Sequence, residues 1–184
     1  MELSVLLQFR EVDTGTWKDM ERLFDSRGGP KNCWCMVWRA TPEESKQTSS
    51  ACRKTALKHR VDEGTPVRIL GYDGQEPVAW CSIAPRITYR RPGGIEYDAH
   101  ENVWALVCFF VVRRLRGLGI TKQLIDAAIT HARKNGETIV EAYPVDPDSP
   151  SYRFMGYVET FKSLGFEEVG RVGIRRHILR CRVN

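Results

Sequence analysis

The sequence predicts one domain of the α/β (α+β) class, in which helices pack against a mixed β-sheet. Its 184 residues suit a single folding unit with its own core, and no internal repeat or linker divides them. Segments with strand and helix periodicity follow one another in the order β-α-α-β-β-β-α-β-α-β-β. Residues 1–184 are therefore interpreted as a single domain.

A strand and an amphipathic helix are predicted at the start of the chain. Residues 3–13 read LSVLLQFREVD, an apolar run that favours extended backbone. Residues 14–24 place apolar side chains at helical spacing behind a threonine that can cap the helix. Two glycines and a proline at residues 28–30 then end this pattern.

A second helix is predicted over residues 41–64. Thr41 can cap its start, and Pro42 suits the first helical position. Glu44 stands where the carboxylate of a capping box belongs, and Gly64 closes the segment.

Strands dominate the middle of the chain. Residues 66–86 contain two extended runs on either side of the Asp73-Gly74 dipeptide, which favours a hairpin. Residues 101–113 read ENVWALVCFFVVR and lack polar alternation, as expected for a central strand that is covered on both faces.

A helix with one apolar face is predicted over residues 119–135, with Gly136 as its C-cap. A strand, a second helical segment and two further strands are expected after it. These elements are predicted at residues 138–146, 155–166, 167–172 and 175–183.

Arginines and glycines separate the predicted central strand from the helix that follows it. Arg113, Arg114 and Arg116 precede Gly117 and Gly119 in the sequence RRLRGLG. Backbone N–H groups at a helix N-terminus bind phosphate when no side chain blocks the approach, and glycine removes that block. A tight turn alone would also explain the glycines. The Walker A and Rossmann glycine patterns are both absent from this segment.

This segment resembles motif A of the GCN5-related N-acetyltransferase (GNAT) family, [QR]-x-x-G-x-[GA]. Arg114-x-x-Gly117-x-Gly119 fits the motif literally, and Arg116-x-x-Gly119-x-Thr121 departs from it in the last position. The second register is preferred because it aligns the preceding strand better with the family pattern.

The stretch ETFKSLGFEEVG at residues 159–170 is similar to a second family element, LYEKLGFxxxG. The resemblance extends over about residues 67–183. It implies a mostly antiparallel central sheet and an acetyl-CoA-dependent acyltransferase. Such an enzyme transfers the acetyl group to a primary amine of a small molecule or protein, by direct attack on the thioester and without a metal.

The resemblance also implies a binding site for acetyl-CoA. The backbone around the glycines would cradle the pyrophosphate, and the end of the central strand would pair with pantetheine. The implied cofactor-binding residues are Phe110, Val111, Val112, Arg114, Arg116, Gly117, Leu118, Gly119, Ile120, Thr121 and Phe161.

Catalytic residues are harder to assign, because Phe161 stands where many family members have a tyrosine as general acid. Tyr152 and Tyr157 are the alternative proton donors, and a backbone N–H near Val111 is the implied oxyanion donor. Glu141 is a candidate general base. His100 and Glu101, just before the central strand, are further candidates.

The segment NCWCMVWR at residues 32–39 lies in the region that covers the acceptor site in this family. Its candidate substrate-binding residues are Trp34, Trp38 and Arg39. Core packing is the alternative interpretation for these aromatic side chains.

The remaining sequence features limit the location and the partners of the protein. Six scattered cysteines and the lack of a signal peptide or a membrane-spanning run predict a cytoplasmic protein without zinc or membrane contact. The net charge of +5 is compatible with nucleic acid, but no nucleic-acid-binding motif accompanies it. An acyl-CoA-binding or sensing protein with little catalysis is the main alternative, and a homodimer is possible.

Overall fold

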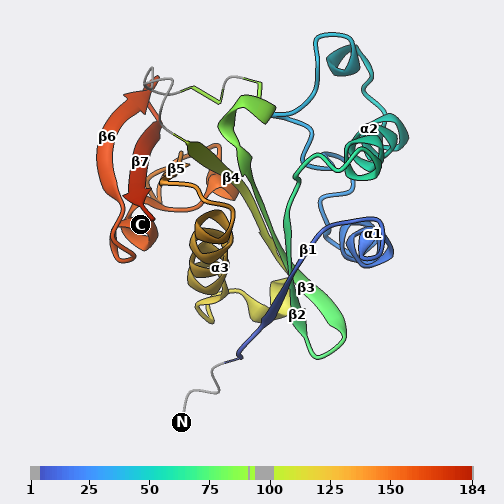
Figure 1. The fold of residues 1–184 in the computed structure, drawn as a ribbon, viewed down its shortest axis with the longest axis horizontal. Helices are drawn as coiled ribbons and strands as arrows, with labels where there is room; N and C mark the ends of the chain where they lie inside the picture. Colours follow the sequence, from blue (N-terminus) through green and yellow to red (C-terminus); the bar gives the residue numbers. More distant parts are fainter. Residues whose placement is uncertain (1–4, 91, 94–101, 184) are drawn as a thin grey trace.

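A seven-stranded mixed sheet forms the centre of the computed structural model, which describes residues 5–90, 92–93 and 102–183. The strand order is β1-β2-β3-β4-β5-β7-β6, and every neighbouring pair is antiparallel except β4 and β5. The strands are β1 Gln8–Glu11, β2 Ile69–Asp73, β3 Glu76–Pro85, β4 Val103–Val111, β5 Ile139–Ala142, β6 Glu167–Val172 and β7 Arg176–Arg182. This confirms the mixed, mostly antiparallel sheet (Figure 1).

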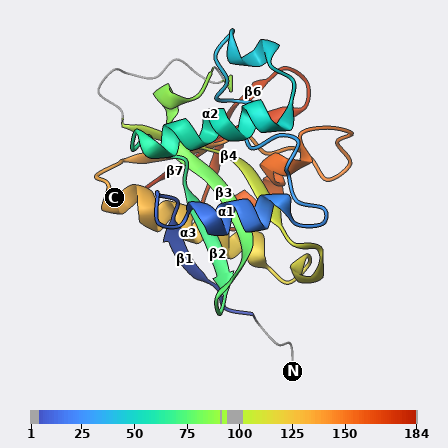
Figure 2. The ribbon, with the colours of Figure 1, turned by 90° about the vertical axis from the view of Figure 1, so that its right-hand side faces the viewer.

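Helices cover both faces of the sheet. Figure 2 shows α1 (Trp17–Asp25) and α2 (Ser50–Asp62) on the face opposite α3 (Ile120–Lys134). The short helix α4 (Val158–Lys162) packs beside α3. Three-residue 3₁₀ turns connect several elements, and η3 (Arg113–Leu115) leads from β4 into α3.

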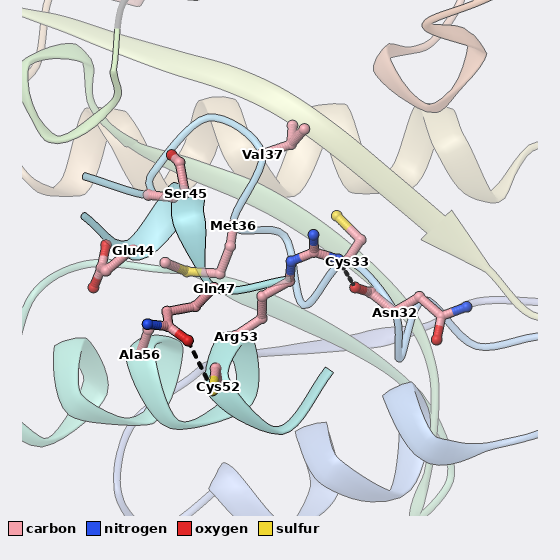
Figure 3. A pocket seen from close by; sticks show the side chains of 11 residues that line it. Asn32, Cys33, Met36, Val37, Glu44, Ser45, Gln47, Cys52, Arg53 and Ala56 are labelled. Atoms are coloured by element: carbon pink, nitrogen blue, oxygen red, sulfur yellow. Dashed lines mark hydrogen bonds between the residues drawn. The ribbon is translucent and has the colours of Figure 1, made fainter. Parts of the chain in front are cut away.

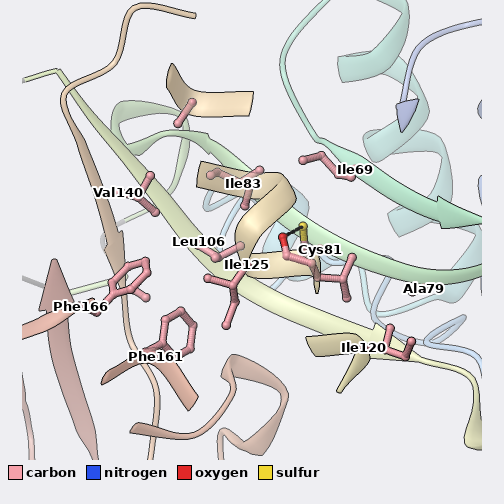
Figure 4. Close-up of a cluster of buried hydrophobic side chains, with 14 of the residues drawn as sticks. Ile69, Ala79, Cys81, Ile83, Leu106, Ile120, Ile125, Val140, Phe161 and Phe166 are labelled. Carbon is pink, nitrogen blue, oxygen red and sulfur yellow. Dashed lines mark hydrogen bonds between the residues drawn. The ribbon is translucent and has the colours of Figure 1, made fainter. Parts of the chain in front are cut away.

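Two apolar clusters fill the space between the sheet and these helices. Trp104 and Leu106 of β4 belong to the cluster under α3, whereas Ala105 and Val107 belong to the cluster under α1 and α2. Figure 4 shows the α3 side, where Leu106 and Phe161 lie close to the helix. The predicted central strand is therefore covered on both faces.

Strands β4 and β5 separate partway along their length. They pair only from Val103↔Ile139 to Leu106↔Ala142. At the same point, the register between β3 and β4 shifts by one residue, which leaves Val107 as an extra residue on β4. From there to Val111, β4 pairs with β3 on one side and with no described strand on the other.

Three predicted elements differ from the observed ones. The first strand occupies only Gln8–Glu11, and Val158–Lys162 is the only α-helical part of residues 155–166. The helix predicted over residues 41–64 is divided into η1 (Glu44–Lys46) and α2. Ser49 provides a second N-cap by accepting from the N–H of Cys52, so α2 begins anew there.

The predicted capping box forms at the start of η1. The N–H of Thr41 donates to Glu44 Oε2 at 2.8 Å, and the N–H of Glu44 donates to Thr41 Oγ1 at 3.2 Å. The guanidinium of Arg60 on α2 also donates to both carboxylate oxygens of Glu44, at 2.8 and 2.7 Å. Glu44 therefore ties η1 to α2.

Replacing Glu44 with Gln should lower the free energy of unfolding by about 1 kcal/mol at neutral pH. The hydrogen bonds from Arg60 hold the pKa of Glu44 below its ordinary value of 4.5. A carboxyl group with a lowered pKa stabilises the fold above that ordinary value, and this stabilisation is lost as the pH falls through the folded-state pKa. The deficit of Glu44→Gln should therefore shrink toward pH of about 3.

Urea denaturation of the parent and the variant at both pH values measures this difference. Glu43→Gln is the matched control, because Glu43 is the exposed neighbour. An equal deficit for Glu44→Gln at both pH values would show that the ion pair with Arg60 is not its cause.

Candidate active site

A cavity of about 630 Å³ opens where β4 ends and α3 begins. Its walls come from the end of β4, the turn into α3, the 3₁₀ turn η4 (Arg153–Met155) and the start of α4. The lining residues are Phe109, Phe110, Val111, Leu115, Arg116, Gly117, Gly119, Ile120, Thr121, Lys122, Arg153, Phe154, Gly156, Tyr157 and Thr160.

The glycine turn forms one wall of this cavity. Gly117 and Gly119 have φ angles of 80° and 74°, in the left-handed region that favours glycine. A Cβ atom on either would meet no atom within 4 Å, so each glycine faces open space. Within the described part of the chain, the N–H groups from Gly117 to Thr121 make no hydrogen bond. These donors and the positive end of the α3 dipole are available to an anion.

The charged residues that line the cavity are all basic. Arg116, Lys122 and Arg153 contribute cations, and the lining contains no Asp or Glu. None of the three cations forms an ion pair with a described residue. Arg116 is held in place because its Nε donates to the carbonyl oxygen of Val111 at 2.9 Å. The cavity therefore carries uncompensated positive charge.

The unpaired edge of β4 contributes backbone groups to the opposite wall. The N–H of Val112 donates to the carbonyl of Val78 on the β3 side. Hydrogen-bonding residues alternate along an antiparallel strand, so the backbone groups of Phe109 and Val111 point away from β3. An extended ligand with amide groups can pair with this edge.

Most of the residues predicted to bind the cofactor lie together in this cavity. The lining includes Phe110, Val111, Arg116, Gly117, Gly119, Ile120 and Thr121. Val112 and Leu118 are adjacent in the chain but do not line it, and Arg114 pairs instead with Asp73 and Glu76.

Phe161 does not reach the cavity. It is fully buried, with its ring centroid 6.0 Å from that of Phe109 and 5.0 Å from that of Phe166. Sequence reasoning missed the contribution of η4, Arg153 and Phe154, because no local pattern places a distant turn beside β4.

The two candidate tyrosines lie in different surroundings. Tyr157 lines the cavity, and its hydroxyl oxygen accepts a hydrogen bond from Arg153 Nε at 3.0 Å. Tyr152 does not line the cavity and stacks on Trp38, with 6.3 Å between ring centroids. Tyr157 is therefore the candidate that the structure places beside the glycine turn.

Glu141 lies outside the cavity lining, in a buried ion-pair cluster on β5. Its carboxylate is paired with Arg86 Nε at 3.1 Å and with Arg180 Nε at 2.7 Å, and it accepts from the Tyr143 hydroxyl. Burial raises the pKa of Tyr143, so its phenol remains protonated. The cluster joins β5 to β7 and to the 3₁₀ turn Arg86–Thr88, which directly follows β3. The other base candidates, His100 and Glu101, fall outside the described residues.

Of the three residues predicted to bind the acceptor, two are buried and one is half-exposed. Trp34 is fully buried, and its ring centroid lies 5.0 Å from that of Phe24. Arg39 is buried and donates to the carbonyls of Pro66 and Val67 and to the hydroxyls of Ser82 and Tyr89. Burial lowers the pKa of Arg39. Only Trp38 remains half-exposed.

A second cavity, of about 360 Å³, lies between residues 32–40 and α2. Figure 3 shows Cys33 and Met36 on one side of it and Cys52 on the other. Cys35 turns inward, with its Sγ atom 3.3 Å from Cys108 Sγ, and all six cysteines are free. No group of three or more His, Cys, Asp or Glu within the described ranges is placed to hold a metal ion.

The structure is thus an α/β protein in which unpaired N–H groups at the start of α3 lie beside a strand edge that pairs with no described strand, in a cavity lined by basic side chains. Residues 31–157, more than half of the chain, match the acetyltransferase (GNAT) family. The chain therefore belongs to the GNAT family of acetyltransferases. A search of curated proteins found no match. None of the helices in the described part has the length and apolar character needed to cross a membrane.

Solved structures share this fold at low sequence identity. The chain is 13% identical to yncA of Salmonella typhimurium, solved with its cofactor acetyl-CoA, with a TM-score of 0.58 and coverage of 97% and 94% of the two chains. It is 15% identical to the aminoglycoside N(6')acetyltransferase of Legionella pneumophila, with a TM-score of 0.56 and coverage of 100% and 94%. For an N-acetyltransferase of Staphylococcus aureus Mu50, the identity is 10%, the TM-score 0.59 and the coverage 97% and 99%.

Replacing Gly119 with Val should weaken the binding of acetyl-CoA at least about tenfold, because the side chain would stand between the backbone donors and the phosphates. Each lost hydrogen bond to a charged group is worth about 1.5–3 kcal/mol. Calorimetric titration with acetyl-CoA measures the change in affinity.

Gly136→Val is the matched control. Gly136 lies just beyond the other end of α3 and has a φ angle of 77°. As at Gly119, a Cβ atom added there would meet no atom within 4 Å. Both substitutions impose the same backbone strain, so both should lower the melting temperature similarly. If Gly119→Val bound acetyl-CoA as tightly as Gly136→Val, the glycine turn would not be the phosphate site.

Proposed function

We propose that this GNAT protein is an N-acetyltransferase that transfers the acetyl group of acetyl-CoA to a primary amine of a small molecule or a protein. The observation that carries the proposal is the cavity at the start of α3. It combines unpaired backbone N–H groups from Gly117 to Thr121 with three cations and no carboxylate. A polyanion with a long amide-bearing arm would be complementary to the glycine turn and to the free edge of β4.

Each part of acetyl-CoA has a complementary surface in this cavity. The donors of the glycine turn suit the pyrophosphate, and Arg116 and Lys122 add charge beside them. The free edge of β4 at Phe109 and Val111 suits the amides of pantetheine, and the N–H near Val111 suits the oxyanion.

The positive charge of the cavity also affects the protonation state of the acceptor amine. A primary amine must lose its proton before it attacks the thioester carbonyl. Arg116, Lys122 and Arg153 disfavour an ammonium ion in the cavity and so favour the neutral amine. Tyr157 is our candidate for the group that gives a proton to the departing thiolate. Because its oxygen already accepts from Arg153, its own O–H is free to point elsewhere.

Calorimetry with acetyl-CoA and a thiol-release assay over a panel of amines test the proposal. Binding together with amine-dependent thiol release is the expected result. Absence of binding at millimolar acetyl-CoA would reject it. Binding without thiol release for any amine would favour the alternative, an acyl-CoA-binding or sensing protein. The six free cysteines support a reducing compartment such as the cytoplasm.

Replacing Tyr157 with Phe should lower kcat about 10²-fold and change the affinity for acetyl-CoA far less, because the proton donor is lost while the cationic Arg153 stays in the cavity. Thiol-release kinetics with the best amine of the panel measure kcat, and calorimetry measures affinity.

Tyr72→Phe is the control for loss of a phenol. Tyr72 is buried on β2, its hydroxyl contacts Asp19 at 2.9 Å, and it does not line the cavity. If Tyr152→Phe lost activity and Tyr157→Phe kept it, the proton donor would be Tyr152 instead.

A further inference from the structure

Arg176, at the start of β7, lies against two aromatic rings. Its guanidinium carbon is 4.8 Å from the ring centroid of Trp38 and 5.0 Å from that of Tyr152. The two rings are stacked at 27° to each other. One N–H of Arg176 donates to the carbonyl of Pro92. We call Trp38, Tyr152 and Arg176 the Arg176 slot.

The slot contains hydrogen-bond donors but no acidic partner. Arg60, which is also partly buried, pairs with the carboxylate of Glu44, and the buried Arg39 donates to four carbonyl and hydroxyl oxygens. Arg176 forms no ion pair with any residue in the described ranges, and the bond to Pro92 is the only hydrogen bond of its side chain there. The indole N–H of Trp38 is also buried without an acceptor in the described part of the chain. A partly buried guanidinium that lies against two rings and pairs with no described carboxylate has the chemistry to bind a planar anion.

The slot adjoins the candidate active site. Tyr152 directly precedes Arg153 and Phe154, which line the cavity, and its ring centroid is 6.3 Å from that of Phe154. Phe110 also lines the cavity and packs against the same apolar cluster as Trp38 and Tyr152. The Arg176 slot and the cavity are therefore neighbours that share the segment from Tyr152 to Phe154.

The local charge indicates which acceptors the slot favours. The neighbouring Arg175 donates to Ser151 Oγ at 3.1 Å, which places a second, exposed cation beside the loop of Tyr152. Burial lowers the pKa of Arg176, which reflects the cost of removing its charge from water, and a bound anion would offset that cost. Polycationic acceptors would be repelled from the same surface.

We propose that the Arg176 slot binds a carboxylate of the amine acceptor, so that the preferred acceptors are amino acids or peptides with a free carboxylate. This inference rests on the proposed N-acetyltransferase function. Planar carboxylate and guanidinium groups can form paired hydrogen bonds, while Trp38 and Tyr152 keep the guanidinium in place.

Binding of unreactive product analogues tests the slot without catalysis. The probes are N-acetylated amino acids and N-acetylated dipeptides, each compared by calorimetry with its C-terminal amide in the presence of coenzyme A. The parent protein should bind at least one carboxylate probe about tenfold or more tightly than the matching amide. Whether amino acids or dipeptides bind better identifies the source of the carboxylate.

Arg176→Gln should abolish this preference, and Arg176→Lys should retain only part of it, because lysine lacks the planar fork. Arg182→Gln is the matched control, since Arg182 is exposed on the same strand and contacts neither ring. Melting temperatures of all variants show whether the fold is intact. Equal binding of carboxylate and amide probes by the parent, binding of neither, or an equal loss of preference in Arg182→Gln would overturn the inference.

Kinetics separate this inference from the proposed function. If the protein releases thiol with amines, Arg176→Gln should lower kcat/KM for carboxylate-bearing acceptors about 10- to 100-fold and change it little for their amides. If it releases no thiol but discriminates between the probes, the proposed function fails and the slot stands. Equal kinetic losses for acids and amides would make Arg176 a structural residue.

Discussion

The extra residue on β4 is the constraint from which the candidate site follows. Val107 shifts the register with β3 at the point where pairing with β5 ends. The remainder of β4 therefore keeps one partner and has one free edge. Because η3 and α3 follow immediately, the N-terminus of α3 begins beside that edge. One local irregularity thus brings two sets of unused backbone donors to the same cavity.

The placement of carboxylates decides where the excess positive charge remains. Glu141 pairs with both Arg86 and Arg180, and Glu44 pairs with Arg60 between η1 and α2. These pairs support the fold and leave no acid in the lining of the cavity. Some of the basic side chains behind the net charge of +5 therefore lie in the cavity and in the Arg176 slot, and not only on a solvated face. Arginines that look alike in sequence therefore differ in whether a neighbouring element of the fold supplies a carboxylate.

Local signals in the sequence were enough to predict the central strand, α3 and the glycine turn. Periodicity and turn chemistry act over neighbouring residues, and Gly119 has the backbone geometry that such a turn requires. The surroundings of Trp34 and Arg39 could not be predicted this way. Trp34 and Cys35 adopt φ angles of 46° and 50°. Positive φ angles are uncommon in residues other than glycine, so nothing in the sequence predicts them here. That turn directs Trp34 into the core, and long-range contacts with β3 and its neighbours bury Arg39.

The absence of a tyrosine at position 161 follows from the packing of α4. The ring of Phe161 lies between Phe109 and Phe166, in the apolar cluster under α3. A hydroxyl on that ring would be buried among apolar side chains, at a cost of several kcal/mol unless it found a partner. Tyr157 stands one turn earlier, at the cavity, where Arg153 satisfies its oxygen. A phenol at position 161 would lie in the core and could not reach a ligand in the cavity, whereas Tyr157 lines the cavity.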